Sequence, residues 1–243
     1  MALEKAYKLL AAQEGISNSK AKGLIDRGLV KVGNRKVLVA RGELDSNVTF
    51  RVEKLADIEI IYEDENMIVI NKPAFASSEE IEKAFDGAVL LHRLDKETSG
   101  VMILTKDEDF RRKAIGEFKR DKVYKEYVAW VEGIVMEDMD INKPILTVKG
   151  KTAKSKIDKY GKPARTEVFP LLATRKRSKV KLVIHQGRTH QIRCHLRSVG
   201  HSIVGDTLYG GFENDRVMLH SKKIEILGKK FEVKEPGIFK KFE

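Results

Sequence analysis

The spacing of apolar residues predicts two short helices at the start of the chain. The apolar face of the first consists of Leu3, Tyr7, Leu10 and Ala11. Gly15 can adopt the left-handed conformation that commonly ends a helix. Ser17 or Ser19 then caps the second helix. Its apolar face consists of Ala21, Leu24 and Ile25.

A hairpin is expected directly after these helices. Leu29–Val32 and Val37–Val39 are apolar runs on either side of a Gly33-Asn34 turn. Gly42-Glu43 reads as another turn, and Val48, Phe50 and Val52 then alternate as a strand. We therefore expect residues 1–54 to form one small unit and residues 55–243 a second domain.

The rest of the chain is dominated by short strands. They are expected at Ile58–Tyr62, Met67–Ile70, Val101–Thr105, Tyr124–Val131, Thr166–Leu172 and Lys179–His185. A helix fits Asp107–Lys119, where Phe110, Ala114 and Phe118 form one stripe, and another fits Thr189–Val199 with Thr189 as its cap. Strand and helix do not alternate regularly. The pattern predicts an α+β fold with a mixed, mainly antiparallel sheet.

Composition narrows the class of protein. The 243 residues are 42% hydrophobic, which supports a packed core. The apolar runs are too short for a membrane-spanning helix or a secretory signal. Cys194 is the single cysteine, so an internal disulfide or a cysteine-based zinc site is excluded. We expect a cytoplasmic protein.

Positive charge is abundant and unevenly distributed. The net charge is +11, from 47 Lys and Arg against 36 Asp and Glu. Residues 143–164 carry seven Lys against one acid, and residues 165–200 carry nine Lys or Arg against one acid. Residues 57–65 carry five acids and no base. This polarity favours a polyanionic partner such as nucleic acid, although a merely solvated basic surface remains the alternative.

Two segments combine the residue types that carry chemistry. His92–Gly100 places an acid, Asp95, among hydroxyl residues before an apolar strand, so Asp95 is a nucleophile, a general base or only a turn cap. The second segment, His185–His195, leads into the helix predicted at Thr189–Val199. Arg193 and Arg197 lie four residues apart on one face of that helix. Its amino end, with Arg188 beside it, suits a phosphate. The spacing of its histidines and the lack of a nearby carboxylate disfavour a metal site. Tyr127, taken alone, reads as a half-buried strand residue.

Together these motifs resemble those of the RluA-type pseudouridine synthases. His92–Gly100 matches the family's HRLD-x-x-TSG signature, and Lys125-x-Tyr127-x-Ala129 follows in the family's order. The resemblance continues through the segment from Gly187 to His195, through Gly200–Asp206, and to Leu219-His220. It covers residues 57–235. Residues 3–53 resemble the RNA-binding module of the ribosomal-protein-S-four type.

One departure stands at the early Lys-Pro-x-Gly motif. This chain reads Lys72-Pro73-Ala74-Phe75, so Phe75 replaces the usual glycine. The stretch from Phe75 to Leu90 is also acidic. Both positions are expected to border the substrate, so they bear on the choice of RNA target more than on the chemistry.

The resemblance implies an RNA pseudouridine synthase that needs no cofactor and no metal, because the reaction only isomerises uridine. It implies that Asp95 is the catalytic carboxylate, that Arg193 keeps it ionised, and that Tyr127 stacks on the flipped uracil. Arg93 would fill the gap that the uridine leaves. The expected RNA contacts are His92, Arg93, Arg188, His190 and Arg197, with Lys20, Lys22 and Arg27 in the first unit.

Large-subunit ribosomal RNA is the favoured substrate, because the accessory module accompanies ribosomal enzymes more often than transfer-RNA enzymes. A tRNA-directed enzyme of the same family and a non-catalytic RNA-binding protein are the alternatives. We expect a monomer with no membrane partner.

Overall fold

The computed structural model describes residues 3–33, 35–53, 57–148, 150 and 153–243. The chain divides into two compact units, Met1–Asp57 and Ile58–Glu243. The boundary predicted between residues 54 and 55 falls outside the described residues, as does Asn34 of the predicted turn. Each unit is described separately below.

The first unit contains two helices and two small sheets. Its elements are β1 (Leu3–Lys5), α1 (Ala6–Glu14), α2 (Asn18–Asp26), β2 (Val30–Val32), β3 (Arg35–Lys36), β4 (Glu43–Asp45) and β5 (Phe50–Val52). Strand β1 pairs with β4, and β2 lies between β3 and β5. The core that joins helices and sheets consists of Ala6, Leu10, Ala21, Ile25, Val30, Val37, Ala40 and Phe50.

The structure confirms both helices and corrects three details of the first unit. Gly15 ends α1 with φ 64°, and the Ser17 side chain caps α2 by accepting the Lys20 N–H. Leu3 belongs to strand β1 and is 64% exposed, because the first helix begins only at Ala6. The partner of β2 is Arg35–Lys36 rather than Val37–Val39, and Glu43, predicted in a turn, begins strand β4.

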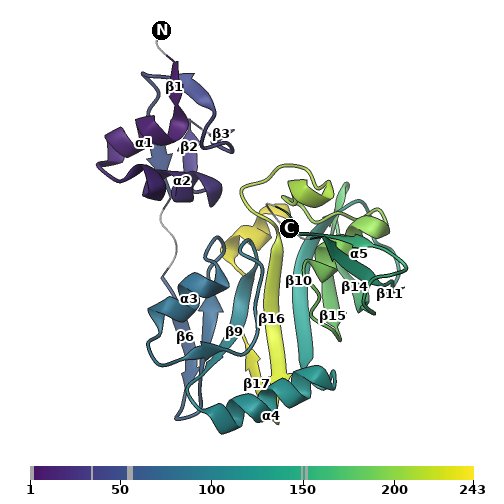
Figure 1. Ribbon diagram of the computed structural model, residues 1–243. Coiled ribbons are helices and arrows are strands. Elements are labelled where there is room, and N and C mark those ends of the chain that lie inside the picture. Colours follow the sequence, from purple (N-terminus) through teal and green to yellow (C-terminus); the bar gives the residue numbers. More distant parts are fainter. Residues whose placement is uncertain (1–2, 34, 54–56, 149, 151–152) are drawn as a thin grey trace. The chain divides into compact units, whose positions relative to one another are not determined.

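The second unit is built on one ten-stranded sheet (Figure 1). Its strands are β6 (Glu59–Glu63), β7 (Met67–Lys72), β8 (Val89–Leu90), β9 (Ser99–Thr105), β10 (Tyr124–Glu132), β11 (Met139–Asn142), β14 (Arg165–Ala173), β15 (Arg177–Ile184), β16 (Leu219–Ile226) and β17 (Lys229–Glu232). The main order is β11-β14-β15-β10-β16-β9-β7-β6. Only β9 and β16 pair in parallel among the described strands. The α+β class and the mainly antiparallel sheet are thereby confirmed.

Helices and one hairpin lie outside this sheet. They are α3 (Ser78–Ala84), α4 (Glu108–Lys119), α5 (Gln191–Ser198), the short 3₁₀ helices η1 (Thr207–Tyr209) and η2 (Gly237–Phe242), and the β12–β13 hairpin (Ile145–Val148 and Lys154–Ile157). The helix predicted at Asp107–Lys119 is confirmed as α4, which begins one residue later because Asp107 is its cap. Helix α5 begins later than predicted, because its cap is His190 rather than Thr189. No helix in the described part of the chain is long and apolar enough to cross a membrane.

The sheet order brings distant segments of the sequence to one place. Strands β9, β16, β10 and β15 are consecutive neighbours, and β10 and β16 run side by side through the middle of the unit (Figure 1). The loop before β9 carries Asp95, β10 carries Tyr127, and β15 leads into the helix that carries Arg193. Residues separated by up to 98 positions can therefore converge at one edge of the sheet.

Gly100 is required where β9 meets β16. Its φ is 119°, and a Cβ at this position would overlap the carbonyl of Ser221 on the parallel neighbour. Gly100→Ala is expected to lower the free energy of unfolding by about 3 kcal/mol or more, because backbone strain and steric overlap add. Urea unfolding followed by circular dichroism measures this.

Gly228→Ala is the matched control. Gly228 also has a positive φ, 75°, but nothing lies within 4 Å of the added Cβ. Only the conformational cost of about 1–2 kcal/mol applies there. Equal losses in the two variants would contradict the steric role assigned to Gly100.

Candidate active site

The loop that carries Asp95 is held through its backbone. Asp95 and Thr98 close a turn, since the Thr98 N–H donates to the Asp95 carbonyl at 3.0 Å. The Ser78 hydroxyl donates to the Leu94 carbonyl and accepts the Leu94 N–H. Arg216 donates to the Glu97 carbonyl at 3.4 Å. The backbone on both sides of Asp95 is thus anchored by side chains that lie elsewhere in the sequence.

A buried lysine ties the Lys-Pro segment to this loop. Lys72 is fully buried, and its ammonium donates to the carbonyls of Pro73, Ala76 and Lys96 at 2.7–3.2 Å. Burial lowers the pKa of Lys72 to about 7. Three carbonyl acceptors occupy its three N–H donors, so Lys72 has a structural role and joins the Lys-Pro segment to the Asp95 loop.

Phe75, the departure from the family pattern, retains the backbone conformation that a glycine would favour. Its φ is 71°, which is unusual for a bulky residue. The Phe75 N–H donates to the carbonyl of Lys96 at 2.8 Å. The neighbouring loop therefore holds residue 75 in the left-handed region although its side chain disfavours that region.

Arg193 is the central cation of the site. It is 4% exposed, and its Nε and Nη2 donate to both carboxylate oxygens of Asp206 at 2.7 and 2.8 Å. Its third nitrogen, Nη1, lies 3.3 Å from Asp95 Oδ2 and 3.6 Å from Glu97 Oε2. Burial alone would lower the pKa of Arg193, but the bonds to Asp206 and the three negative charges raise it above its usual value. The guanidinium is therefore a permanent charge next to Asp95.

Tyr127 lies on β10 at the point where the register against β16 shifts. Such a bulge re-aims a side chain. Tyr127 is 8% exposed and lines the narrow part of the cleft together with Asp95, Ile184 and Leu219. Burial raises the pKa of Tyr127, a hydrogen bond with Ser221 lowers it in part, and the charge of Asp95 raises it further. The phenol keeps its proton at neutral pH.

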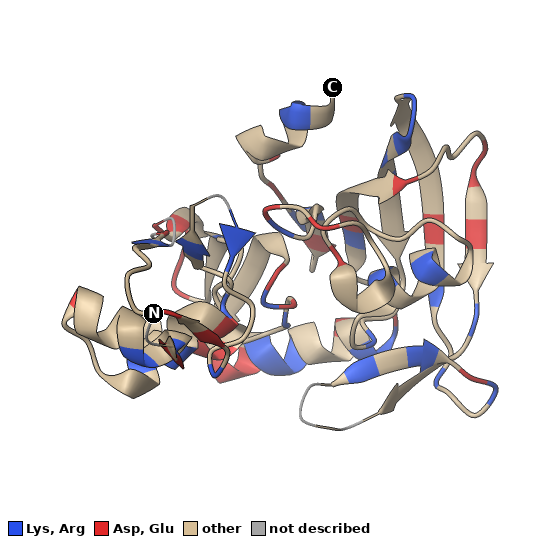
Figure 2. Cartoon of the chain, turned by 90° about the horizontal axis from the view of Figure 1, so that it is seen from above, with Lys and Arg blue, Asp and Glu red and all other residues tan. Residues whose placement is uncertain are grey.

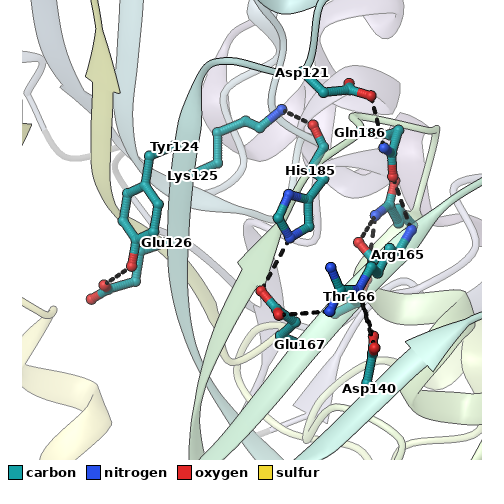
Figure 3. Close-up of polar contacts among 11 residues, drawn as sticks. Asp121, Tyr124, Lys125, Glu126, Asp140, Arg165, Thr166, Glu167, His185 and Gln186 are labelled. Carbon is teal, nitrogen blue, oxygen red and sulfur yellow. Dashed lines mark hydrogen bonds and ion pairs between the residues drawn. The ribbon is translucent and has the colours of Figure 1, made fainter. Parts of the chain in front are cut away.

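A polar network fixes the segment that leads into α5 (Figure 3). The Gln186 side chain donates to Asp121 and accepts the Arg165 N–H, both at 2.9 Å. The His185 carbonyl accepts from Lys125 at 2.8 Å, and its ring faces Glu167 at 3.1 Å. Residues 187–190 therefore start from an anchored position and present Arg188 and His190 to the cleft.

The cleft consists of a wide and a narrow part with shared walls. The wide part has a volume of about 610 Å³ and the narrow part about 70 Å³. Residues common to both parts are Arg93, Leu94, Asp95, Gly187, Arg188, His190 and Arg193. Arg93 is exposed and forms an ion pair with Glu79 of α3 at 2.6 Å. Asp95 thus lies where the larger and the smaller part of the cleft meet.

The lysine-rich β12–β13 hairpin borders this cleft through Ala153. Lys154 and Lys156 lie on β13, and the hairpin is joined to the cleft wall because the Ser155 hydroxyl donates to the Thr189 carbonyl at 2.6 Å. Lys and Arg are coloured blue in Figure 2, and the described part of the hairpin carries Lys154 and Lys156. The arrangement offers positive charge beside the entrance to the cleft.

Other predicted contacts lie outside the cleft walls. His92 accepts the Ile103 N–H, and burial lowers its pKa to about 4, so it supports the loop from behind. Arg197 is exposed and its guanidinium lies against Gly210. Lys20, Lys22 and Arg27 lie on or next to α2 in the first unit.

The three histidines considered for a metal have separate partners. His185 faces Glu167, His190 faces Tyr209, and His195 lies between the Thr166 hydroxyl and the Lys143 carbonyl. Within the described ranges, no group of three or more His, Cys, Asp or Glu side chains could hold a metal ion.

Sequence reasoning assigned no role to Asp206, Glu97 or Lys72. Asp206 is 1% exposed and is the main partner of Arg193. Asp206 stands directly after Gly205 in a motif that resembles the family's, and this position was the available signal of a role. Its partner Arg193 lies 13 residues away, so the pairing could be seen only in the folded structure. Lys72 was visible only as part of the Lys-Pro motif.

Comparison with known proteins identifies the class to which this mixed sheet and its cleft belong. The model of the RNA pseudouridylate synthase family matches residues 66–198. The chain belongs to this family and is a pseudouridine synthase.

Named relatives cover most of the chain. An "Uncharacterized RNA pseudouridine synthase" of Helicobacter pylori strain J99 is 49% identical over 240 residues, covering 98% of this chain and 99% of that protein. "Ribosomal large subunit pseudouridine synthase D" of Pasteurella multocida is 30% identical over 80% of this chain and 69% of its own length. The solved structure of "Human RNA Pseudouridylate Synthase Domain Containing 1" is 28% identical, with a TM-score of 0.65 over 75% of this chain and 84% of that chain.

Asp206 is expected to be needed for stability because Arg193 is buried. Asp206→Asn keeps the shape but removes the charge that compensates the guanidinium, so the free energy of unfolding should fall by about 3 kcal/mol. Urea unfolding at pH 7 measures the loss.

Asp140→Asn is the control for this prediction. Asp140 also pairs with an arginine through two oxygens, Arg165 at 2.9 and 3.1 Å, but this pair is about half exposed. Its loss should cost less than about 1 kcal/mol. A similar cost for both substitutions would show that burial does not strengthen the Arg193 pair.

Proposed function

We propose that this enzyme converts specific uridines to pseudouridine in large-subunit ribosomal RNA, with Asp95 as the catalytic carboxylate. The observation that carries the proposal is the contact between Asp95 Oδ2 and Arg193 Nη1 at 3.3 Å inside the cleft. The buried guanidinium of Arg193 places a permanent positive charge beside this carboxylate, which stabilises its negative charge and fixes its position.

The reaction rearranges bonds within one nucleotide. The bond between the ribose C1′ and uracil N1 breaks, the freed ring turns, and C5 bonds to C1′ while the proton of C5 is released and N1 gains one. Nothing is oxidised and no external group enters. An ionised Asp95 supplies the nucleophile or base that this sequence requires, in the manner of carboxylates that cleave glycosidic bonds.

Arg193 and Tyr127 complete the proposed catalytic group. Arg193 stabilises the charge of Asp95 before it reacts, and Asp206 holds the guanidinium in place with two hydrogen bonds. Tyr127 offers a flat ring in the narrow part of the cleft, where an extruded uracil would stack. The protonated phenol of Tyr127 can also donate the proton that uracil N1 gains.

The target uridine must leave the base stack of the RNA to enter the cleft. Unstacking costs a few kcal/mol, which stacking and phosphate contacts offset. Arg188 and Arg93 line the entrance and are the proposed phosphate and gap-filling residues, whereas Glu79 holds Arg93 in the RNA-free protein. The ion pair between Arg93 and Glu79 must open for Arg93 to enter the RNA.

The choice of ribosomal RNA rests on two supports. One is the name of the Pasteurella multocida relative, a large-subunit enzyme. The other is the proposal that the first unit is an RNA-binding module of the ribosomal-protein-S-four type, with Lys20, Lys22 and Arg27 on or beside α2.

The proposal is tested with RNA carrying tritium at uracil C5, in EDTA. Wild-type protein is expected to release tritium from large-subunit ribosomal RNA fragments, because C5 loses its hydrogen when it bonds to C1′. Asp95→Asn should reduce the release by at least about 1,000-fold, since the carboxylate is the reacting group.

Asp109→Asn, on the exposed face of α4, is the control and should retain full activity. Release from transfer RNA alone would overturn the substrate assignment and keep the reaction. Undiminished release by Asp95→Asn would remove Asp95 from the mechanism.

The role of the first unit is tested by replacing Lys20, Lys22 and Arg27 together with Gln. Each lost phosphate contact should reduce the slope of log affinity against log salt by about 0.7–0.9, so three should reduce it by about 2. Filter binding over a salt series measures the slope. The same replacement of Arg112, Lys113 and Lys119, which are exposed on α4, should leave the slope unchanged, and identical slopes for both triple variants would contradict a role for the first unit.

A further inference from the structure

His190 occupies an unusual position between the candidate carboxylate and the lysine-rich hairpin. It caps α5 with φ 52° and ψ 27°, in the left-handed region, and its side chain makes no capping bond. Its ring instead bridges two groups. Nδ1 lies 3.0 Å from the Tyr209 hydroxyl and Nε2 lies 3.8 Å from Asp95 Oδ2. Such backbone strain at a bridging residue points to a role for the side chain.

The hydrogen bonds of Tyr209 favour one tautomer of His190. The Tyr209 oxygen accepts the Ser155 N–H at 2.8 Å. Its own hydrogen is then available to donate, and the His190 Nδ1 at 3.0 Å is the acceptor in line for it. Burial raises the pKa of Tyr209, so this hydrogen is retained. The neutral imidazole consequently carries its proton on Nε2, the atom that faces Asp95.

The charges around His190 keep this ring neutral. Burial lowers its pKa; Asp95 acts in the opposite direction, while Arg193 lowers it further. The ionisable groups that face the ring or its hydroxyl partner are Asp95, Glu97, Arg193, Asp206, Tyr209 and Lys154. A neutral ring can donate from Nε2 without adding a second full positive charge beside Arg193.

We propose that neutral His190 is a positioning residue, whose Nε2–H orients the Asp95 carboxylate and is itself held by Tyr209 and the β12–β13 hairpin. This inference rests on the proposed function of Asp95. Arg193 Nη1 and His190 Nε2 both approach the same oxygen, Oδ2, so together they restrict the rotation of the carboxylate. The hairpin contributes through Ser155, which bonds both Tyr209 and the Thr189 carbonyl.

The same contacts connect His190 to a basic surface. Lys154 and Lys156 lie on β13, which is joined to the ring of His190 through the Tyr209 hydroxyl.

Three variants distinguish positioning from RNA contact or packing. His190→Gln places an amide N–H near the position of Nε2, so kcat for tritium release should stay within about threefold of wild type. His190→Asn suits the left-handed backbone but is too short to reach Asp95, so kcat should fall at least tenfold. Tyr209→Phe removes the hydroxyl that holds the ring, so its kcat should fall by a similar factor. KM for RNA should change less than twofold in all three.

A pattern in which KM rises while kcat is unchanged would make His190 an RNA contact and overturn the proposal. Equal kcat losses in His190→Gln and His190→Asn would also overturn the proposal. Only His190→Asn lacks a donor near the position of Nε2, so a lost donor could not explain both losses. Urea unfolding of each variant separates these outcomes from a loss of folding.

Nitrogen-15 NMR of the histidine ring tests the same proposal without RNA. Wild-type protein at pH 7 should show His190 as the neutral tautomer protonated on Nε2, and Tyr209→Phe should lose this preference. A ring protonated on Nδ1, or on both nitrogens at pH 7, would overturn the inference even if no RNA substrate were turned over. Absence of tritium release by wild-type protein would instead count against the proposed function alone.

Discussion

The site depends on the burial of one guanidinium. Arg193 is withdrawn from water, and such a charge is tolerated only when it is paired and hydrogen-bonded. Asp206 meets that requirement with two bonds at 2.7 and 2.8 Å, which leaves the third nitrogen directed at Asp95 at 3.3 Å. The shorter pair thus supports the guanidinium, and the longer pair is the contact that the proposed reaction would use. Because Asp95 keeps a quarter of its side-chain surface exposed, its carboxylate stays accessible from the cleft.

The fold brings the other groups to this pair through sheet order and anchored loops. Adjacent strands β9, β16 and β10 bring the Asp95 loop next to Tyr127, and the single parallel pair among the described strands is formed where Gly100 allows close approach to Ser221. Lys72 then fastens the Lys-Pro segment to the Asp95 loop. The loops at the site carry the candidate chemistry, and the sheet beneath them sets their spacing.

Local patterns in the sequence predicted much of this structure, and long-range pairing accounts for what they missed. The Ser17 cap and the Phe110 stripe of α4 depend on neighbours a few residues away, so they could be predicted. Motif resemblance indicated Asp95, Tyr127 and Arg193, and the structure brings them to one cleft.

Other features depend on distant contacts. Leu3 joins a strand because β4 lies beside it. Helix α5 begins after His190 rather than after Thr189, and the His190 ring is hydrogen-bonded to Tyr209, which lies 19 residues away. Asp206 could not be paired with Arg193 before the fold was known.

The central claim, that Asp206 acts on the reaction through Arg193, is tested most directly by a double-mutant cycle on the rate of tritium release at saturating RNA. Asp206→Asn and Arg193→Lys should each slow the reaction about 100-fold, and the double variant should be within about threefold of Arg193→Lys alone, because one unit is lost in each case. Losses that multiply to about 10,000-fold would contradict the account.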